Sequence, residues 1–135
     1  MGKWDAGRRM KHLPLIMLSL VGIIHLFPLS GVLGAEKLST LYGIGFQDPN
    51  LLILMRHRAV LFGIFGVFLM IAAFRPAWHL WAFFSAFVSV VSFILLAWSA
   101  GEFNQELHRV FVADLVALGM IIIGLVARLI ALRKT

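Results

Sequence analysis

Seven ionisable side chains lie within or beside long apolar stretches of this sequence, where such groups are rare. They are His25, Arg56, His57, Arg58, His108, Arg109 and Asp114. An ionisable group in an apolar environment is costly, so those that occur there indicate a functional site or a buried ion pair. Two arginines beside a histidine suit the recognition of a carboxylate or another anionic group. We therefore take these seven residues as the candidate polar site, for ligand binding or for structure.

The most specific prediction concerns Asp114, which follows Ala113 inside an apolar stretch. An unpaired carboxylate at that position would destabilise a helix in hydrocarbon. Arg58, beside Ala59, lies at a similar depth in another apolar stretch. We predict that Arg58 and Asp114 form a pair. The pair either only fixes the register of two helices or takes part in a function, and the sequence leaves both open.

His25 is interpreted as a hydrogen-bonded core residue, close to Pro28, which lacks a backbone N–H. Two histidines that face each other from different helices can bind haem b. The pairs that could do so here are His25 with His57 and His25 with His108. We keep haem b as an alternative and expect no other cofactor. No close spacing of His, Asp and Glu predicts a metal site. The absence of cysteine excludes disulfides, thiolate nucleophiles and iron–sulfur clusters.

The motifs of several large enzyme classes are absent from the sequence. It contains no Walker loop, dinucleotide fingerprint, Gly-x-Ser-x-Gly elbow or His-Glu-x-x-His helix. Gly43-Ile44-Gly45 follows no strand and is interpreted as a flexible turn. The sequence therefore leaves open whether the protein is an enzyme, and a non-enzymatic protein is our first expectation.

The elements that must position the polar residues are four apolar runs, at about residues 13–33, 51–74, 78–100 and 107–132. Each is long enough for the ~20 residues with which a helix crosses a bilayer. With 61% hydrophobic and 13% charged residues, the composition lies far from that of soluble domains. The fold class predicted is all-α: a single domain, residues 1–135, forming an integral membrane four-helix bundle of up-down-up-down topology. We interpret the first run as a retained helix, because it is too long for a signal peptide.

The ends of the second run carry helix signals. Asp48 is predicted to be an N-cap with Pro49 at the first helical position, so this helix begins before its apolar part. Pro76 is expected to close the helix. Residues 34–47 are expected to form a surface loop or a short interfacial helix.

Small residues repeat along three of the runs and predict how the helices pack, because helices in a membrane associate through close contacts. The repeats are Ala59, Gly63, Gly66, Met70 and Ala73; Ala82, Ser85, Ser89 and Ser92; and Ala113, Ala117, Met120, Gly124, Ala127 and Ala131. Spacings that alternate between three and four residues are typical of left-handed packing. The serines are interpreted as packing residues. Phe83, Phe84, Phe87 and Phe93 are expected to face lipid.

The distribution of basic residues predicts the orientation. Eight of the twelve lie at the N-terminus, the C-terminus or the connection after the second run: Lys3, Arg8, Arg9, Lys11, Arg75, Arg128, Arg133 and Lys134. Because lysine and arginine favour the inner side, both termini are predicted to be cytoplasmic. The seven polar-site residues, with Glu106 and other acids at the same rim, then lie toward the outer leaflet. The net charge of +6 is assigned to these flanks, and no nucleic-acid partner is expected.

Several stretches of the sequence resemble a known family. They are HLFPLSGVLG at 25–34, LYGI at 41–44, DPNL at 48–51, LMRHRAVLFG at 54–63, AAFRP at 72–76 and VADLVA at 112–117. They are similar to a family of small bacterial four-helix inner-membrane proteins, whose members often carry the label phosphopantetheine adenylyltransferase. That label names a soluble α/β enzyme with a Thr/His-x-Gly-His motif, which is absent here. The resemblance therefore implies a topology and a bacterial cytoplasmic (inner) membrane, and no activity.

These observations predict a small multi-pass membrane protein. We expect an accessory subunit, or a binding module for a lipid-like or quinone-like ligand near the outer leaflet. The alternative is a membrane-embedded enzyme or haem-binding redox protein that uses His25, Arg56, His57, Arg58 and Asp114. The expected partners are the lipid bilayer and either a larger membrane complex or further copies of the chain.

Overall fold

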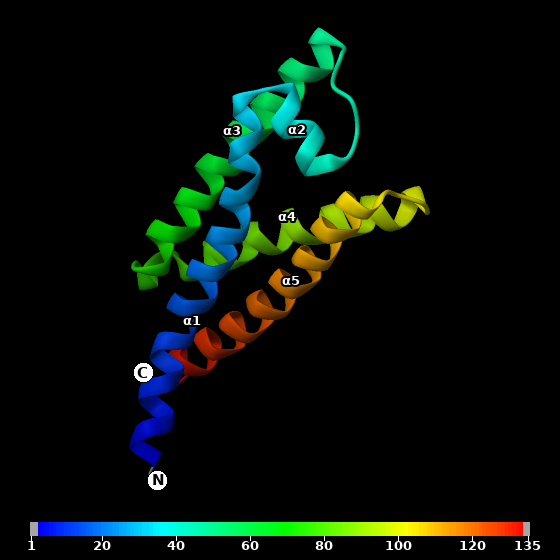
Figure 1. Ribbon diagram of the computed structural model, residues 1–135. Coiled ribbons are helices and arrows are strands. Elements are labelled where there is room, and N and C mark those ends of the chain that lie inside the picture. Colours follow the sequence, from blue (N-terminus) through cyan, green and yellow to red (C-terminus); the bar gives the residue numbers. More distant parts are fainter. Residues whose placement is uncertain (1–2, 134–135) are drawn as a thin grey trace.

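The structure, a computed structural model, describes residues 3–133, which form helices joined by short connections (Figure 1). The elements are α1 (Lys3–Leu26), η1 (Phe27–Leu33), α2 (Ala35–Tyr42), α3 (Pro49–Ala73), η2 (Pro76–Trp78), α4 (His79–Ala100) and α5 (Gln105–Leu132). The described part of the chain has no strand, so the all-α prediction is confirmed. Lys134 and the side chains of Lys3, Arg8 and Arg9, which entered the charge count, lie outside the described residues.

Four segments of the described chain are long and apolar enough to cross a membrane. They are Lys11–Leu33, Pro49–Ala73, Pro76–Ala100 and Gln105–Leu132. Each predicted run agrees with one of them to within two residues at both ends. Only 17–28% of the most apolar window of each segment is buried inside the protein. Most of the apolar surface therefore faces outward, as Trp81 and Trp98 do with 72% and 76% exposure.

The helices begin where the sequence supplies a cap. Asp48 Oδ1 accepts hydrogen bonds from the backbone N–H groups of Asn50 at 2.7 Å and Leu51 at 3.3 Å. Pro49 occupies the first turn, where its missing N–H costs nothing. The N-cap prediction is confirmed. The short helix allowed for between residues 34 and 47 is α2, which ends at Gly43 with a φ of 67°.

The first span changes its winding before it ends. From Phe27 to Leu33 the chain forms a 3₁₀ helix, with Pro28 in its first turn. Side chains three residues apart lie above one another in such a helix, so Phe27 and Leu33 both face outward, with exposures of 69% and 76%. Gly31 lies on the inner side, where an added Cβ would be 2.6 Å from Leu38 Cδ2. The missing side chain lets α2 pack closely against this segment.

A close backbone contact joins α1 and α3, which lie side by side (Figure 1). A Cβ added to Gly66 would lie 3.0 Å from the Gly22 carbonyl oxygen, and one added to Gly22 would lie 3.2 Å from that of Gly66. The two backbones therefore meet without intervening side chains. The small-residue stripe predicted for α3 is largely confirmed, because Ala59, Gly63, Gly66 and Ala73 are buried.

The packing face of α4 differs from the prediction. The buried residues are Ala82, Phe83, Ala86 and Val90, whereas the serines of the predicted stripe lie beside this face, partly or fully exposed. Ser85 and Ser92 donate to carbonyls of their own helix. Phe83 does not face outward as predicted, because Gly124 of α5 leaves room for its ring. A Cβ on Gly124 would lie 2.5 Å from Phe83 Cζ.

Side chains join three helices at the end of the bundle opposite to α2. His79 Nε2 donates to the Ala73 carbonyl at 3.0 Å, which links α4 to the end of α3. Arg128 Nη2 of α5 donates to the Pro76 carbonyl at 3.1 Å. These contacts fix the turn between α3 and α4.

Candidate functional site

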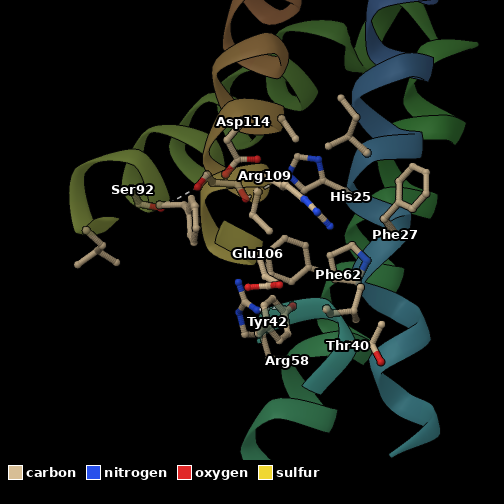
Figure 2. A pocket seen from close by; sticks show the side chains of 18 residues that line it. His25, Phe27, Thr40, Tyr42, Arg58, Phe62, Ser92, Glu106, Arg109 and Asp114 are labelled. Carbon is tan, nitrogen blue, oxygen red and sulfur yellow. Dashed lines mark hydrogen bonds between the residues drawn. The ribbon is translucent and has the colours of Figure 1, made fainter. Parts of the chain in front are cut away.

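A cavity of about 630 Å³ lies at the end of the bundle where α2 packs (Figure 2). Side chains from α1, η1, α2, α3, α4 and α5 all contribute to its walls. Small-molecule sites usually measure about 300–1,000 Å³, so the cavity is large enough for a ligand.

Four of the seven predicted site residues line this cavity: His25, Arg58, Arg109 and Asp114. The other three, Arg56, His57 and His108, are exposed and lie outside its lining. Arg56 Nε donates to the Val32 carbonyl at 2.9 Å, and the His108 ring stacks on Phe103 at 6.2 Å between centroids. The predicted site is therefore divided between a cavity and the outer surface.

His25 is fixed in the cavity wall by both ring nitrogens. Its Nδ1 lies 2.9 Å from the Val21 carbonyl oxygen. Because a carbonyl only accepts, Nδ1 must carry the hydrogen. In the neutral ring, Nε2 then accepts from the Ser89 hydroxyl, 3.2 Å away on α4. With 3% of its surface exposed, His25 agrees with its interpretation as a hydrogen-bonded core residue.

Arg58, Phe62 and His25 form a stack that crosses from α3 to α1. The Arg58 guanidinium carbon lies 4.7 Å from the Phe62 ring centroid. The Phe62 ring in turn lies 5.7 Å from the His25 ring, at an angle of 19°. Arg58 Nη1 also donates to Tyr42 Oη at 2.8 Å. A cation over an aromatic face is attracted to it, so the guanidinium is held in one position before any ligand arrives.

The predicted pair of Arg58 and Asp114 takes a different form. Both side chains line the cavity, and the positive charge of Arg58 acts on the carboxylate of Asp114. The hydrogen bond of Arg58 goes to Tyr42, however, and not to Asp114. The expected direct ion pair is therefore replaced by two opposite charges in one cavity, because α2 brings Tyr42 within reach of the arginine.

Three charged groups of the cavity have no hydrogen-bonded protein partner. Within the part of the chain that the structure describes, Glu106, Arg109 and Asp114, all on α5, form no hydrogen bond or ion pair. In Figure 2, Glu106 lies near Tyr42 and Arg58, Asp114 lies nearer His25, and Arg109 extends between them. Glu106 and Asp114 are half-buried and Arg109 is exposed, so these three are the groups available to a ligand.

Sequence reasoning missed Tyr42 and gave Glu106 only a place at the rim. The available signal for Tyr42 was that it is the sole tyrosine of the chain and ends a short amphipathic segment. Phe62, Phe93 and Leu96 supply apolar wall. Phe93 was expected to face lipid, and it instead faces the cavity.

The helix α2 is tied to α5 through one asparagine. Asn104 Oδ1 accepts from the Leu107 N–H at 2.9 Å and so caps α5. Its Nδ2 donates to the Tyr42 carbonyl at 2.7 Å. Gly43, which follows Tyr42 in the chain, has no room for a side chain, because a Cβ there would lie 2.5 Å from Glu106 Oε2. Asn104 thus holds Tyr42 and Glu106 in register.

Replacing Asn104 by alanine is expected to lower the free energy of unfolding by about 2 kcal/mol, since it removes a cap and a second hydrogen bond. Asn104→Ser keeps a capping oxygen and loses only the bond to the Tyr42 carbonyl, so about half of that loss is expected. Thermal unfolding of the two variants in detergent measures the difference. Equal stability of both variants would show that the bond to Tyr42 contributes nothing.

The cavity does not bring two histidines together. His25 lines it, whereas His57 and His108 do not, so neither predicted haem pair faces across this space. Within the described residues, no group of three or more His, Asp or Glu side chains is placed to hold a metal ion.

In comparisons with known proteins, no family model, curated protein or solved structure matches this chain. Its function therefore has to be argued from the cavity.

Proposed function

We propose that this protein is a small integral membrane protein that binds an amphipathic, lipid-like or quinone-like molecule in the cavity between its helices. The observation that carries the proposal is the lining of that cavity. Glu106, Arg109 and Asp114 offer unpartnered charges, while Phe62, Phe93 and Leu96 offer apolar wall in the same space. A molecule with a polar head and an apolar body satisfies both kinds of surface.

Membrane integration is supported by the small buried share of the four apolar segments, at most 28%. If the protein were soluble, water would cover the remaining apolar surface, and this exposure would cost a free energy of about 25 cal/mol for each Å². We propose that lipid covers this surface and that the four segments cross the bilayer in alternating directions, with left-handed packing. The excess of basic residues beside the termini supports a cytoplasmic location for both.

In this orientation the cavity opens toward the outer leaflet of a bacterial inner membrane. The family resemblance supports that membrane, although it carries no activity. The protein then acts as a binding module, either as an accessory subunit of a larger membrane complex or as a homo-oligomer. We propose no catalytic step. The histidine pairs that the haem alternative requires do not meet at the cavity.

The proposal predicts that protein purified in a mild detergent retains a lipid or a quinone in native mass spectra. Ala113 lines the cavity, and Ala113→Phe is expected to fill it and to lower the retained fraction at least about tenfold. The adjacent residue Val112 is 44% exposed and does not line the cavity. Val112→Phe is therefore the matched control and should retain the ligand.

Equal retention by Ala113→Phe and Val112→Phe would show that the cavity is not the binding site. A Soret absorbance band in the purified protein would instead favour the haem alternative.

A further inference from the structure

We infer that the head group bound in this cavity carries both a phosphate and a primary ammonium, as in phosphatidylethanolamine. The inference rests on the proposed function and names its ligand class. It starts from the balance of charge in the cavity, where Arg58 and Arg109 face Glu106 and Asp114. His25 and Ser89 hydrogen-bond to each other, so these four side chains determine which charges the ligand must bring.

Simpler head groups satisfy fewer of these charges. A singly anionic lipid such as phosphatidylglycerol would pair with the arginines and draw them away from the carboxylates. A neutral quinone would offer a partner to neither sign, so the half-buried Glu106 and Asp114 would keep only the two arginines of the cavity as counter-charges. A head group with one charge of each sign offers a partner to both the arginines and the acids.

The order of charges along α5 fits such a head group. Arg109 follows Glu106 by three residues and precedes Asp114 by five, which corresponds to roughly 4.5 Å and 7.5 Å along the helix axis. In Figure 2 the Arg109 side chain extends between those of Glu106 and Asp114, so a phosphate on Arg109 has a carboxylate on either side. Ethanolamine places its ammonium two carbons from the phosphate oxygen, so the ammonium can reach an acid while the phosphate stays on the arginine.

The carboxylates of the cavity distinguish a primary ammonium from a trimethylammonium. Quaternary ammonium groups bind on aromatic faces; the guanidinium of Arg58 already lies over Phe62 and near the Tyr42 ring, at 4.7 Å and 5.4 Å, whereas Phe27 and Phe93 stay open. The choice therefore rests on the carboxylates of Glu106 and Asp114, which accept hydrogen bonds. An –NH₃⁺ group donates three such bonds and a choline group donates none.

A competition experiment tests the head group. Full-length protein in mild detergent, supplied with equal amounts of phosphatidylethanolamine, phosphatidylcholine and phosphatidylglycerol, is expected to retain the first about tenfold better in native mass spectra. Retention of either other lipid at the same level would overturn the inference. Displacement of the lipid by soluble phosphoethanolamine would assign the same chemistry to a free head group, whereas no displacement assigns it to the lipid.

Two substitutions identify the residues responsible. Glu106→Gln and Asp114→Asn keep side-chain shape and remove one negative charge each, so the preference for phosphatidylethanolamine over phosphatidylglycerol should fall about tenfold in at least one of them. Glu102 is exposed and lies outside the cavity, and Glu102→Gln is the control. An unchanged preference in both cavity variants would overturn the inference.

Failure of this inference and failure of the proposed function are distinguishable. A quinone retained in place of every phospholipid, and lost in Ala113→Phe, would overturn the head-group assignment and leave the binding module in place. If Ala113→Phe retained every ligand that the unsubstituted protein retains, both the head-group assignment and the proposed function would be overturned.

Discussion

Replacing Gly66 by valine is expected to lower the free energy of unfolding by about 3 kcal/mol. A Cβ at this position would lie 2.8 Å from Leu26 Cδ2 and 3.0 Å from the Gly22 carbonyl oxygen. The Leu26 side chain can move away by changing its rotamer. The Gly22 carbonyl cannot move away, because it belongs to the backbone of α1. The helices α1 and α3 would therefore have to separate, and α1 also packs against α5, so the disturbance reaches the whole bundle.

Loss of helical circular dichroism on heating in detergent measures the effect. The matched control is Gly119→Val, because a Cβ on Gly119 of α5 meets open space and the helix propensity of the two changes is the same. If both variants unfolded at the same temperature, the backbone contact between α1 and α3 would carry no stability.

Phe83→Ala is the second substitution for which we expect a large effect, a loss of about 3 kcal/mol. The Phe83 side chain is fully buried and its ring fills the space above Gly124. Removal of the ring leaves a cavity between α4 and α5 that the rigid helices cannot close. The serines of α4 were interpreted as its packing residues and Phe83 was expected to face lipid, but this ring in fact packs against Gly124 of α5.

Phe84, next in the chain, is the control for this prediction. It is 63% exposed, so Phe84→Ala should change the unfolding free energy only slightly in detergent. Titration with a denaturing detergent compares the two variants, and similar midpoints would contradict the packing of Phe83 between the helices.

The lengths and limits of the helices were predictable from the sequence because they follow from local chemistry. Apolar length fixes the four long segments, and Asp48-Pro49 fixes the start of α3. The 3₁₀ winding from Phe27 to Leu33 was not predicted. Pro28 showed that the helix is loosened there, but the new winding depends on the contact of Gly31 with Leu38 of α2, which is a tertiary contact.

The sequence predicted which types of residue form the site, but it did not predict which of their side chains face the cavity. Arg56, His57 and Arg58 are consecutive in a helix, where neighbours point about 100° apart, so they cannot all face one cavity. Arg58 faces inward, and Arg56 and His57 are exposed. The choice depends on which face of α3 meets α1 and η1, through Gly66 and Gly63 respectively. Tyr42 could have been noticed as the sole tyrosine of the chain, but its place beside Arg58 was not predictable, because a connecting segment gives no sign of the helix on which it folds.

The 3₁₀ segment also sets the length of the first span. Its seven residues rise about 2.0 Å each, whereas α-helical residues rise about 1.5 Å. The first span of 23 residues and the second of 25 then both measure roughly 38 Å along their axes. The narrower, more extended 3₁₀ winding around Pro28 thus lets a shorter segment match its neighbour in length, as the proposed crossing of one bilayer by both segments requires.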